Sequence, residues 1–175
     1  MRGKMHAALG LTFGAACGTA FFQDDITKGA IFLAACTLGS LIPDVDLPTS
    51  TIGKAFRPLS GAIYHVCGHR GFVHSLLCSV LITMLTGFTE SYFYPAYGEA
   101  FMFGLFSGYL LHLLQDSCTP YGVQWLWPFR HRFHIPFVWC RYESQVRYWI
   151  LTVVIFLVTT GIVFYAGMFS GILSA

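Results

Sequence analysis

The sequence predicts an all-α protein, a polytopic membrane helical bundle with about five transmembrane helices and a cytoplasmic N-terminus. Its 175 residues are 55% apolar and only 10% charged, whereas charged residues make up about a quarter of an ordinary soluble domain. Five stretches approach the length of about 20 apolar residues that a helix needs to cross a bilayer. This composition excludes a disordered chain, a nucleic-acid-binding arm and a secreted disulfide scaffold. Because one domain takes about 150 residues, we expect residues 1–175 to form a single domain.

The predicted spans cover residues 6–22, 29–43, 72–88, 100–115 and 149–173. The first two are short, rich in Gly and Ala, and separated only by the polar turn Gln23-Asp24-Asp25. Small residues let helix backbones approach closely in lipid, so these stretches predict a tight helical hairpin, either spanning or re-entrant. A secretory signal is the alternative for the first stretch. It fits less well, because Gly14 is unusual in a lipoprotein cleavage box and cleavage would remove His6.

The distribution of Lys and Arg predicts the orientation of the bundle. From the N-terminus through the four connecting segments to the C-terminal tail, the counts of these residues are 2, 1, 3, 0, 4 and 0. Cytoplasmic segments carry the excess of positive charge. We therefore expect the N-terminus and the segments 44–71 and 116–148 to lie in the cytoplasm, with the C-terminus on the far side.

The His and Asp residues that flank the first four spans converge on the predicted cytoplasmic side. They are His6 before span one, Asp44 and Asp46 after span two, His69, Arg70 and His74 around the start of span three, and His112 and Asp116 at the end of span four. The charge count uses only Lys and Arg, so this convergence tests the topology independently. Ionisable groups at membrane depth are costly and indicate a functional site.

The local spacing of two pairs also predicts convergence. His112 and Asp116 are four residues apart, so they lie on the same face of a helix, one turn from each other. Asp44 and Asp46 follow Pro43, which disfavours helix for the residue before it. In an extended segment, residues two apart point the same way.

These residue types predict a site for a divalent metal. His with Asp, without a supporting Cys cluster, suits zinc, and also manganese or iron, better than calcium or magnesium. The candidate metal ligands are His6, Asp44, Asp46, His74, His112 and Asp116. We expect one or two ions, and a two-metal site suits phosphoester hydrolysis by a metal-bound hydroxide. Asp46, His69 and Arg70 are the candidate catalytic residues, with Arg70 placed to hold a phosphate.

The segment LWPFRHRFHIPFVWCR mixes aromatic side chains with Arg. Its plain interpretation is an interfacial belt at the headgroup level that attracts anionic lipid. In the sharper interpretation this loop lies over the metal site, and Arg130 and Arg132 bind the substrate headgroup. His131 and His134 are weaker candidates for further ligands. The expected partners are membrane lipid and a phosphate-containing or lipid substrate, without nucleic acid, and the oligomeric state stays open.

Structural interpretations compete with these functional ones. His112 and Asp116 also fit a hydrogen-bonded pair that joins helices, and His65 is expected to be a helix-packing residue. At the level of the whole protein, the alternatives are a non-catalytic protein whose metal joins the helices, or a small metal or proton transporter with the same ligands. A transporter needs polar residues through the middle of the membrane, where spans one, four and five show almost none.

Three motifs, LIPDVDLP, GHRGFVHSLL and GYLLHLLQDSCTPYGVQWLWP, together with His6, resemble the membrane-bound metal-dependent hydrolase family, also described as LexA-binding, inner-membrane-associated hydrolases. The resemblance runs from His6 to about Pro136 and implies a multi-pass protein of the bacterial inner membrane with a metal site facing the cytoplasm. The LexA link concerns control of expression after DNA damage. A fainter likeness to the zinc-dependent phospholipases C favours phosphoester chemistry.

Overall fold

The computed structural model describes residues 3–135, 150, 153–154, 157–158 and 161, and the chain is helical wherever these residues form regular structure. In chain order the elements are α1 (Gly3–Phe21), α2 (Ile26–Gly39), the 3-10 turn η1 (Ile42–Asp46), α3 (Thr51–Ala55), α4 (Arg57–Cys67), the 3-10 turn η2 (Phe72–His74), α5 (Leu76–Phe93) and α6 (Gly98–Ser117). No strand occurs in this part of the chain; an isolated antiparallel bridge joins Val123 and Phe133. The all-α prediction is confirmed.

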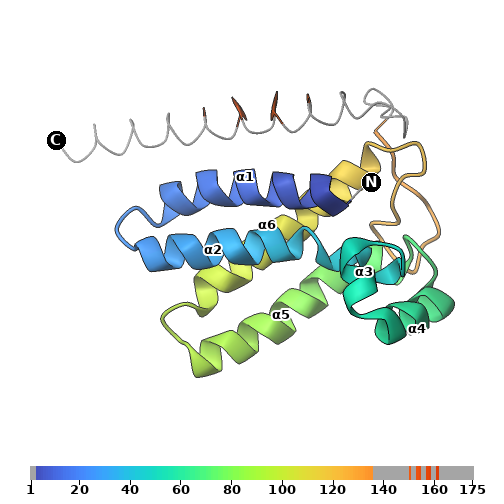
Figure 1. Ribbon diagram of the computed structural model, residues 1–175, viewed down its shortest axis with the longest axis horizontal. Coiled ribbons are helices and arrows are strands. Elements are labelled where there is room, and N and C mark those ends of the chain that lie inside the picture. Colours follow the sequence, from blue (N-terminus) through green and yellow to red (C-terminus); the bar gives the residue numbers. More distant parts are fainter. Residues whose placement is uncertain (1–2, 136–149, 151–152, 155–156, 159–160, 162–175) are drawn as a thin grey trace.

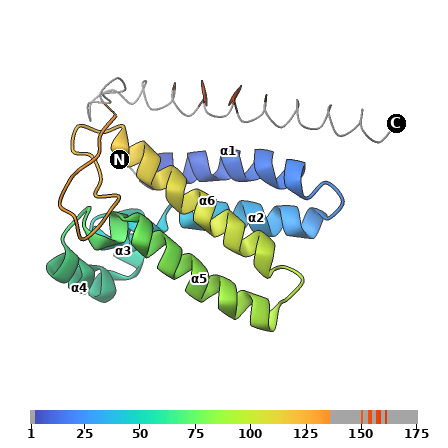
Figure 2. The same cartoon turned by 180° about the vertical axis from the view of Figure 1, so that it is seen from behind.

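Four long helices form the bundle, and they correspond to the first four predicted spans (Figure 1). α2 packs against α1 and α6, and α5 packs against α6. Figures 1 and 2 show that the short elements η1, α3 and α4 gather at one end of the bundle, where α1 begins and α6 ends. The connections at the opposite end are tight turns. This up-and-down arrangement brings the start of α1, the end of α2, the start of α5 and the end of α6 to one place.

Local signals in the sequence explain where these helices begin and end. The Asp25 side chain caps α2 by accepting hydrogen bonds from the backbone N–H groups of Thr27 and Lys28, which confirms the predicted turn between α1 and α2. Such a cap satisfies donors that the first helical turn leaves unpaired. Ser75 caps α5 in the same way through the N–H of Cys78. Pro43 lies in η1, just after α2 ends, and both aspartates lie in this 3-10 turn instead of the extended segment that the sequence predicts, because Pro43 is accommodated in the first turn of η1.

Small residues set the distance between α2 and α6. Gly108 lies so close to α2 that a Cβ there would overlap the backbone carbonyl of Cys36, and a Cβ at Gly39 would overlap the carbonyl of Leu105. Close backbone approach of this kind replaces side-chain interdigitation in membrane bundles. Gly108 is one helical turn before His112, so this contact also determines where His112 lies relative to the end of α2.

We expect Gly108→Ala to lower the free energy of unfolding by about 1–3 kcal/mol or more, the usual cost of overpacking. The reason is that the clashing backbone carbonyl cannot move aside as the end of a side chain can. The matched control is Gly61→Ala in α4, where a Cβ would meet nothing within 4 Å. Denaturation of both variants in mixed micelles measures the free energy of unfolding. A Gly108→Ala protein as stable as the Gly61→Ala protein would contradict the packing described above.

Among the described residues, one helical stretch, the 21-residue segment Ile26–Asp46, is both long enough and apolar enough to cross a membrane, and Leu76–Glu90 is apolar but shorter. The count of five spans therefore stays a prediction, and residues 149–173 lie mostly outside the described residues. Two helices, α3 and α4, occupy a segment for which the sequence predicts no element. His65, expected between packed helices, is instead exposed on α4.

Candidate metal centre

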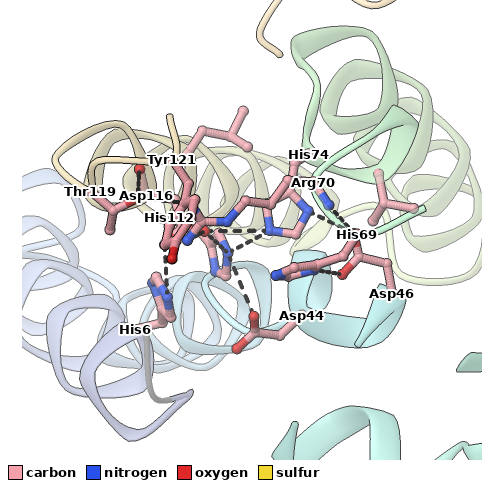
Figure 3. A network of polar contacts seen from close by, with 12 residues as sticks. His6, Asp44, Asp46, His69, Arg70, His74, His112, Asp116, Thr119 and Tyr121 are labelled. Atoms are coloured by element: carbon pink, nitrogen blue, oxygen red, sulfur yellow. Dashed lines mark hydrogen bonds and ion pairs between the residues drawn. The ribbon is translucent and has the colours of Figure 1, made fainter. Parts of the chain in front are cut away.

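The structure brings the sequence-predicted ionisable residues into one cluster of mostly buried side chains at the end of the bundle, the His/Asp pocket (Figure 3). α1 contributes His6, η1 contributes Asp44 and Asp46, the segment before α5 contributes His69, Arg70 and His74, and α6 contributes His112 and Asp116. Three overlapping groups of His and Asp have ligand atoms within 4.8 Å of one another: His6 with Asp44 and His112, His74 with His112 and Asp116, and Asp46 with His69 and His74.

The centre of the pocket is a pair of imidazoles. The Nε2 atoms of His74 and His112 lie 3.2 Å apart, and Asp116 Oδ2 lies 3.7 Å from the first and 3.9 Å from the second. Both rings are completely buried. Two nitrogen atoms and one carboxylate oxygen therefore face the same small volume.

In each of these two imidazoles, the hydrogen-bond partner of Nδ1 determines which ring nitrogen carries the proton. His112 Nδ1 lies 2.7 Å from the backbone carbonyl oxygen of Ser40, which only accepts, so Nδ1 carries the proton and donates it. His74 Nδ1 lies 2.9 Å from Asp46 Oδ2, an acceptor that favours a proton on Nδ1 in the same way. In the neutral rings both Nε2 atoms then present lone pairs to each other. That arrangement is repulsive unless a cation or a shared proton lies between them.

The geometry fits a metal ion. In a tetrahedral zinc centre with Zn–N bonds of about 2.0–2.1 Å, two ligand nitrogens lie about 3.3 Å apart. The observed separation of 3.2 Å between His74 and His112 agrees with that value. A carboxylate holding the second nitrogen of a metal-binding His is a recurrent feature of such centres. Asp46 holds His74 in this way.

His6 and Asp44 extend the pocket on the side of α1. The His6 ring stacks on His112 with centroids 3.7 Å apart and an interplanar angle of 17°. Its Nε2 lies 3.6 Å from Asp116 Oδ1. Asp44 Oδ1 lies 4.0 Å from His112 Nε2, and its second oxygen is buried without a hydrogen-bond partner among the residues that the structure describes. A buried carboxylate oxygen in that state favours a bound cation, because the loss of hydration is otherwise uncompensated.

Asp46 differs from the other carboxylates because both of its oxygens already have donors. Oδ1 pairs with His69 Nδ1 at 2.9 Å, and Oδ2 accepts from His74 Nδ1 at 2.9 Å and from the backbone N–H of Arg70 at 3.0 Å. In this arrangement Asp46 orients two imidazoles and does not point into the centre of the pocket. His69 is 33% exposed at its side chain, whereas Asp46 is fully buried, so the pocket approaches solvent at His69.

Arg70 closes the pocket on the side of α6. Its guanidinium forms an ion pair with Asp116 Oδ2 at 2.9 Å and donates to Thr119 Oγ1 at 2.8 Å and to the Gly122 carbonyl at 3.4 Å. It also lies 5.7 Å from the Tyr121 ring centre. The residue is 5% exposed and has a positive φ of 61°. A backbone in that region is strained for a residue with a side chain, and such strain concentrates at functional sites.

The charges of this pocket favour a cation. Among the described side chains, the carboxylates of Asp44, Asp46 and Asp116 are buried together with one guanidinium, that of Arg70. Buried charges are expensive unless they are paired or coordinate a metal. Neutral histidines do not offset the excess negative charge, and a divalent cation does.

The segment after α6 folds back over the same end of the bundle. The Trp125 carbonyl accepts from the N–H of Leu76, and the Trp125 indole donates to Ser117 Oγ at 2.8 Å. Arg130 and Arg132 are exposed on this segment, and Arg132 donates to the Tyr121 carbonyl at 3.4 Å. His131 and His134 are exposed as well and belong to none of the three His/Asp groups.

Sequence reasoning missed several polar groups around the pocket. The Ser40 carbonyl orients His112, and Thr119 and Gly122 hold Arg70. Gln115 is buried beside His6. A backbone carbonyl leaves no signal in a sequence. Gln115, however, is a large polar residue at the end of the predicted span four, between His112 and Asp116, which is a signal that marks it.

The described structure is that of a helical membrane protein with a buried His/Asp pocket at one end of its bundle. A family model described as YdjM inner membrane protein matches residues 1–170, so the chain belongs to this family. It is an inner membrane protein, which confirms that part of the expected location.

The names of similar proteins state at most a location. Inner membrane protein YdjM of Escherichia coli (strain K12) is 44% identical over 101 residues, which cover 57% of this chain and 50% of that protein. The chain thus matches about half the length of this relative. Uncharacterized protein YvsG of Bacillus subtilis (strain 168) is 32% identical over 136 residues, 78% of this chain and 79% of that protein. Inner membrane protein YbcI of Escherichia coli (strain K12) is 32% identical over 135 residues, 75% of this chain and 70% of that protein. No solved structure matches the chain.

Proposed function

We propose that this chain is a metal-dependent hydrolase of the inner membrane that cleaves a phosphoester or a phospholipid-type substrate at the cytoplasmic leaflet. The proposal includes five spans, with the pocket at their cytoplasmic ends. The observation that carries it is the pair of Nε2 atoms of His74 and His112, which face each other at 3.2 Å with Asp116 beside them. LexA binding is not part of the proposal, since no described residue bears on it.

The residues present divide into those that would hold an ion and those that would serve the reaction. His6, Asp44, His74, His112 and Asp116 would hold one or two divalent ions, with zinc favoured by the donor set. A divalent ion at such a site activates water and polarises a phosphoryl oxygen. A histidine that binds zinc needs a fixed ring orientation, and the Ser40 carbonyl supplies it for His112.

His69 is placed to move a proton. Its Nδ1 is held by the Asp46 carboxylate at 2.9 Å, and its ring is the part of the pocket nearest to solvent. An imidazole held by a carboxylate at one nitrogen transfers protons at the other. We therefore assign His69 the role of general acid or base, with Asp46 orienting both His69 and His74.

The role of the arginines follows from their contacts. Arg70 uses its guanidinium on Asp116, Thr119 and Gly122, so its main role here is to fix the pocket wall, and binding a phosphate would require it to leave these groups. The exposed Arg130 and Arg132 are then the candidates for contact with anionic headgroups.

The second candidate function is structural: a bound metal would only join the helices and would take no part in catalysis. Complete burial of His6, His74 and His112 favours it, because structural centres are closed to solvent. A transporter finds less support: in α1, α2, α5 and α6 the Asp, Glu, Lys, Arg and His residues lie toward the helix ends and are missing from the middle of each helix.

An activity assay with Asp46→Asn separates these functions. Detergent-purified protein is loaded with zinc or manganese, and release of phosphate or headgroup from vesicles of inner-membrane lipid is measured. Loss of the carboxylate that orients His69 and His74 should lower turnover by about 10²–10⁴-fold, the contribution of acid–base catalysis, in a protein that still folds. Equal turnover in both proteins would refute the catalytic role. Metal binding without turnover in either would favour the helix-joining function.

A further inference from the structure

His6 and Gln115 are both buried, and among the described residues neither side chain forms a hydrogen bond of good distance and angle. His6 is 0% exposed, and neither of its ring nitrogens has a hydrogen-bond partner among the described residues. Gln115 is 2% exposed, and neither its amide oxygen nor its amide nitrogen has one. Each unpaired buried polar group costs about 1–3 kcal/mol, so groups of this kind usually complement each other or a ligand.

The two side chains are neighbours in space. Gln115 follows His112 by three residues on α6, which places it about one helical turn further along a similar side of the helix. The His6 ring stacks on His112, and the Gln115 side chain lies beside His6. His6 Nε2 faces Asp116 Oδ1 at 3.6 Å. Nε2 is thus the nitrogen on the side of the metal centre, and Nδ1 is the nitrogen that needs another partner.

We infer that Gln115 is a positioning residue whose amide oxygen accepts the Nδ1–H of His6 and so keeps the His6 Nε2 lone pair directed at the metal. This inference rests on the proposed metal centre and extends it. It gives the third imidazole the kind of partner that the other two already have, since His74 Nδ1 pairs with Asp46 and His112 Nδ1 pairs with the Ser40 carbonyl.

The chemistry of the amide explains why an apolar residue would not serve. Without an acceptor at Nδ1, the neutral His6 ring has no preference for carrying its proton there, and a proton on Nε2 removes the lone pair that a metal needs. Loss of such an outer partner typically weakens metal binding by about 10–100-fold. Gln115 would therefore act through His6 and not by contact with the metal.

The test compares Gln115→Met, which keeps the length of the side chain and removes the acceptor, with Gln115→Glu, which keeps the acceptor. Zinc affinity is measured by competition with a chromogenic chelator, and the visible spectrum of the Co(II)-loaded protein reports the ligand geometry. We expect about 10–100-fold weaker zinc binding and an altered Co(II) spectrum for Gln115→Met. Gln115→Glu should bind zinc at least as tightly as the wild type. The matched control is Thr83→Val, which removes another buried polar group that has no hydrogen-bond partner among the described residues. Thr83 lies about 10 Å along α5 from Leu76, the first residue of that helix, at 1.5 Å per residue.

A His6→Ala background makes the test specific. In that background Gln115→Met should change zinc affinity no further, whereas a merely structural contribution of Gln115 would persist. Wild-type zinc affinity in Gln115→Met would overturn the inference alone. A tenfold loss in Gln115→Glu would overturn it even if Gln115→Met fails to fold. Absence of zinc binding in the wild-type protein would instead overturn the proposed metal centre and the inference together.

Discussion

Replacing His112 by alanine is expected to lower the affinity for zinc by more than about 100-fold. The loss of an outer partner alone costs about 10–100-fold, and His112 contributes to two of the three His/Asp groups in the pocket. Its Nε2 lies 3.2 Å from His74 Nε2, and its ring also supports His6 by stacking. Removing it disturbs both neighbours at once.

The measurement is equilibrium zinc binding to detergent-purified protein, with far-UV circular dichroism to show that the helices persist. His65→Ala is the matched control, because His65 is exposed on α4 and away from the three His/Asp groups. Removing His112 also leaves the Ser40 carbonyl without its donor, which costs about 1–3 kcal/mol of stability. Unchanged zinc stoichiometry in a folded His112→Ala protein would remove the basis for the metal centre.

The second large effect concerns stability. Arg70→Met should lower the free energy of unfolding by about 3–5 kcal/mol, because it removes one partner of a buried ion pair and leaves a desolvated charge. Arg70 is 5% exposed and Asp116 is 1% exposed. The same substitution removes two hydrogen bonds to the segment that follows α6, to Thr119 and Gly122.

Denaturation in mixed micelles measures this change. Arg132→Ala serves as the control, because Arg132 is exposed and, within the described part of the chain, makes one long hydrogen bond of 3.4 Å. A surface substitution of this kind changes stability by less than about 0.5 kcal/mol. If Arg70→Met proves as stable as Arg132→Ala, the Arg70 guanidinium does not stabilise the contact between the pocket and the segment after α6. The prediction that Arg70 binds a phosphate then gains support.

The convergence of the functional residues was predictable from periodicity and charge. Apolar stretches separated by short polar turns predict antiparallel helices, and in such a bundle alternate connections between helices lie at the same end. His112 and Asp116, four residues apart, were expected on one helix face and do share one pocket. Their neighbours across the bundle were predictable as a set, because His6, Asp46 and His74 all lie near helix termini at the same end of the bundle.

The roles within that set were not predictable. Asp44 and Asp46 are two residues apart in one motif, yet Asp46 has donors on both oxygens while one oxygen of Asp44 has none. That difference depends on which donors from the segment before α5 come within 3 Å. Periodicity does not report distances of this size. The helices α3 and α4 were missed for a related reason, since neither is long enough to produce an apolar stretch of membrane length.

The sequence by itself determined the helical class, the approximate positions of the four long helices and the end of the bundle at which His and Asp gather, because these follow from hydropathy, helical period and the short polar turns between helices. Only the tertiary structure decided that the Nε2 atoms of His74 and His112 face each other and that Arg70 turns toward Asp116. The physical reason is that a tautomer is set by the acceptor at the other ring nitrogen. For His112 this acceptor is the Ser40 backbone carbonyl, which lies 72 residues away in the chain.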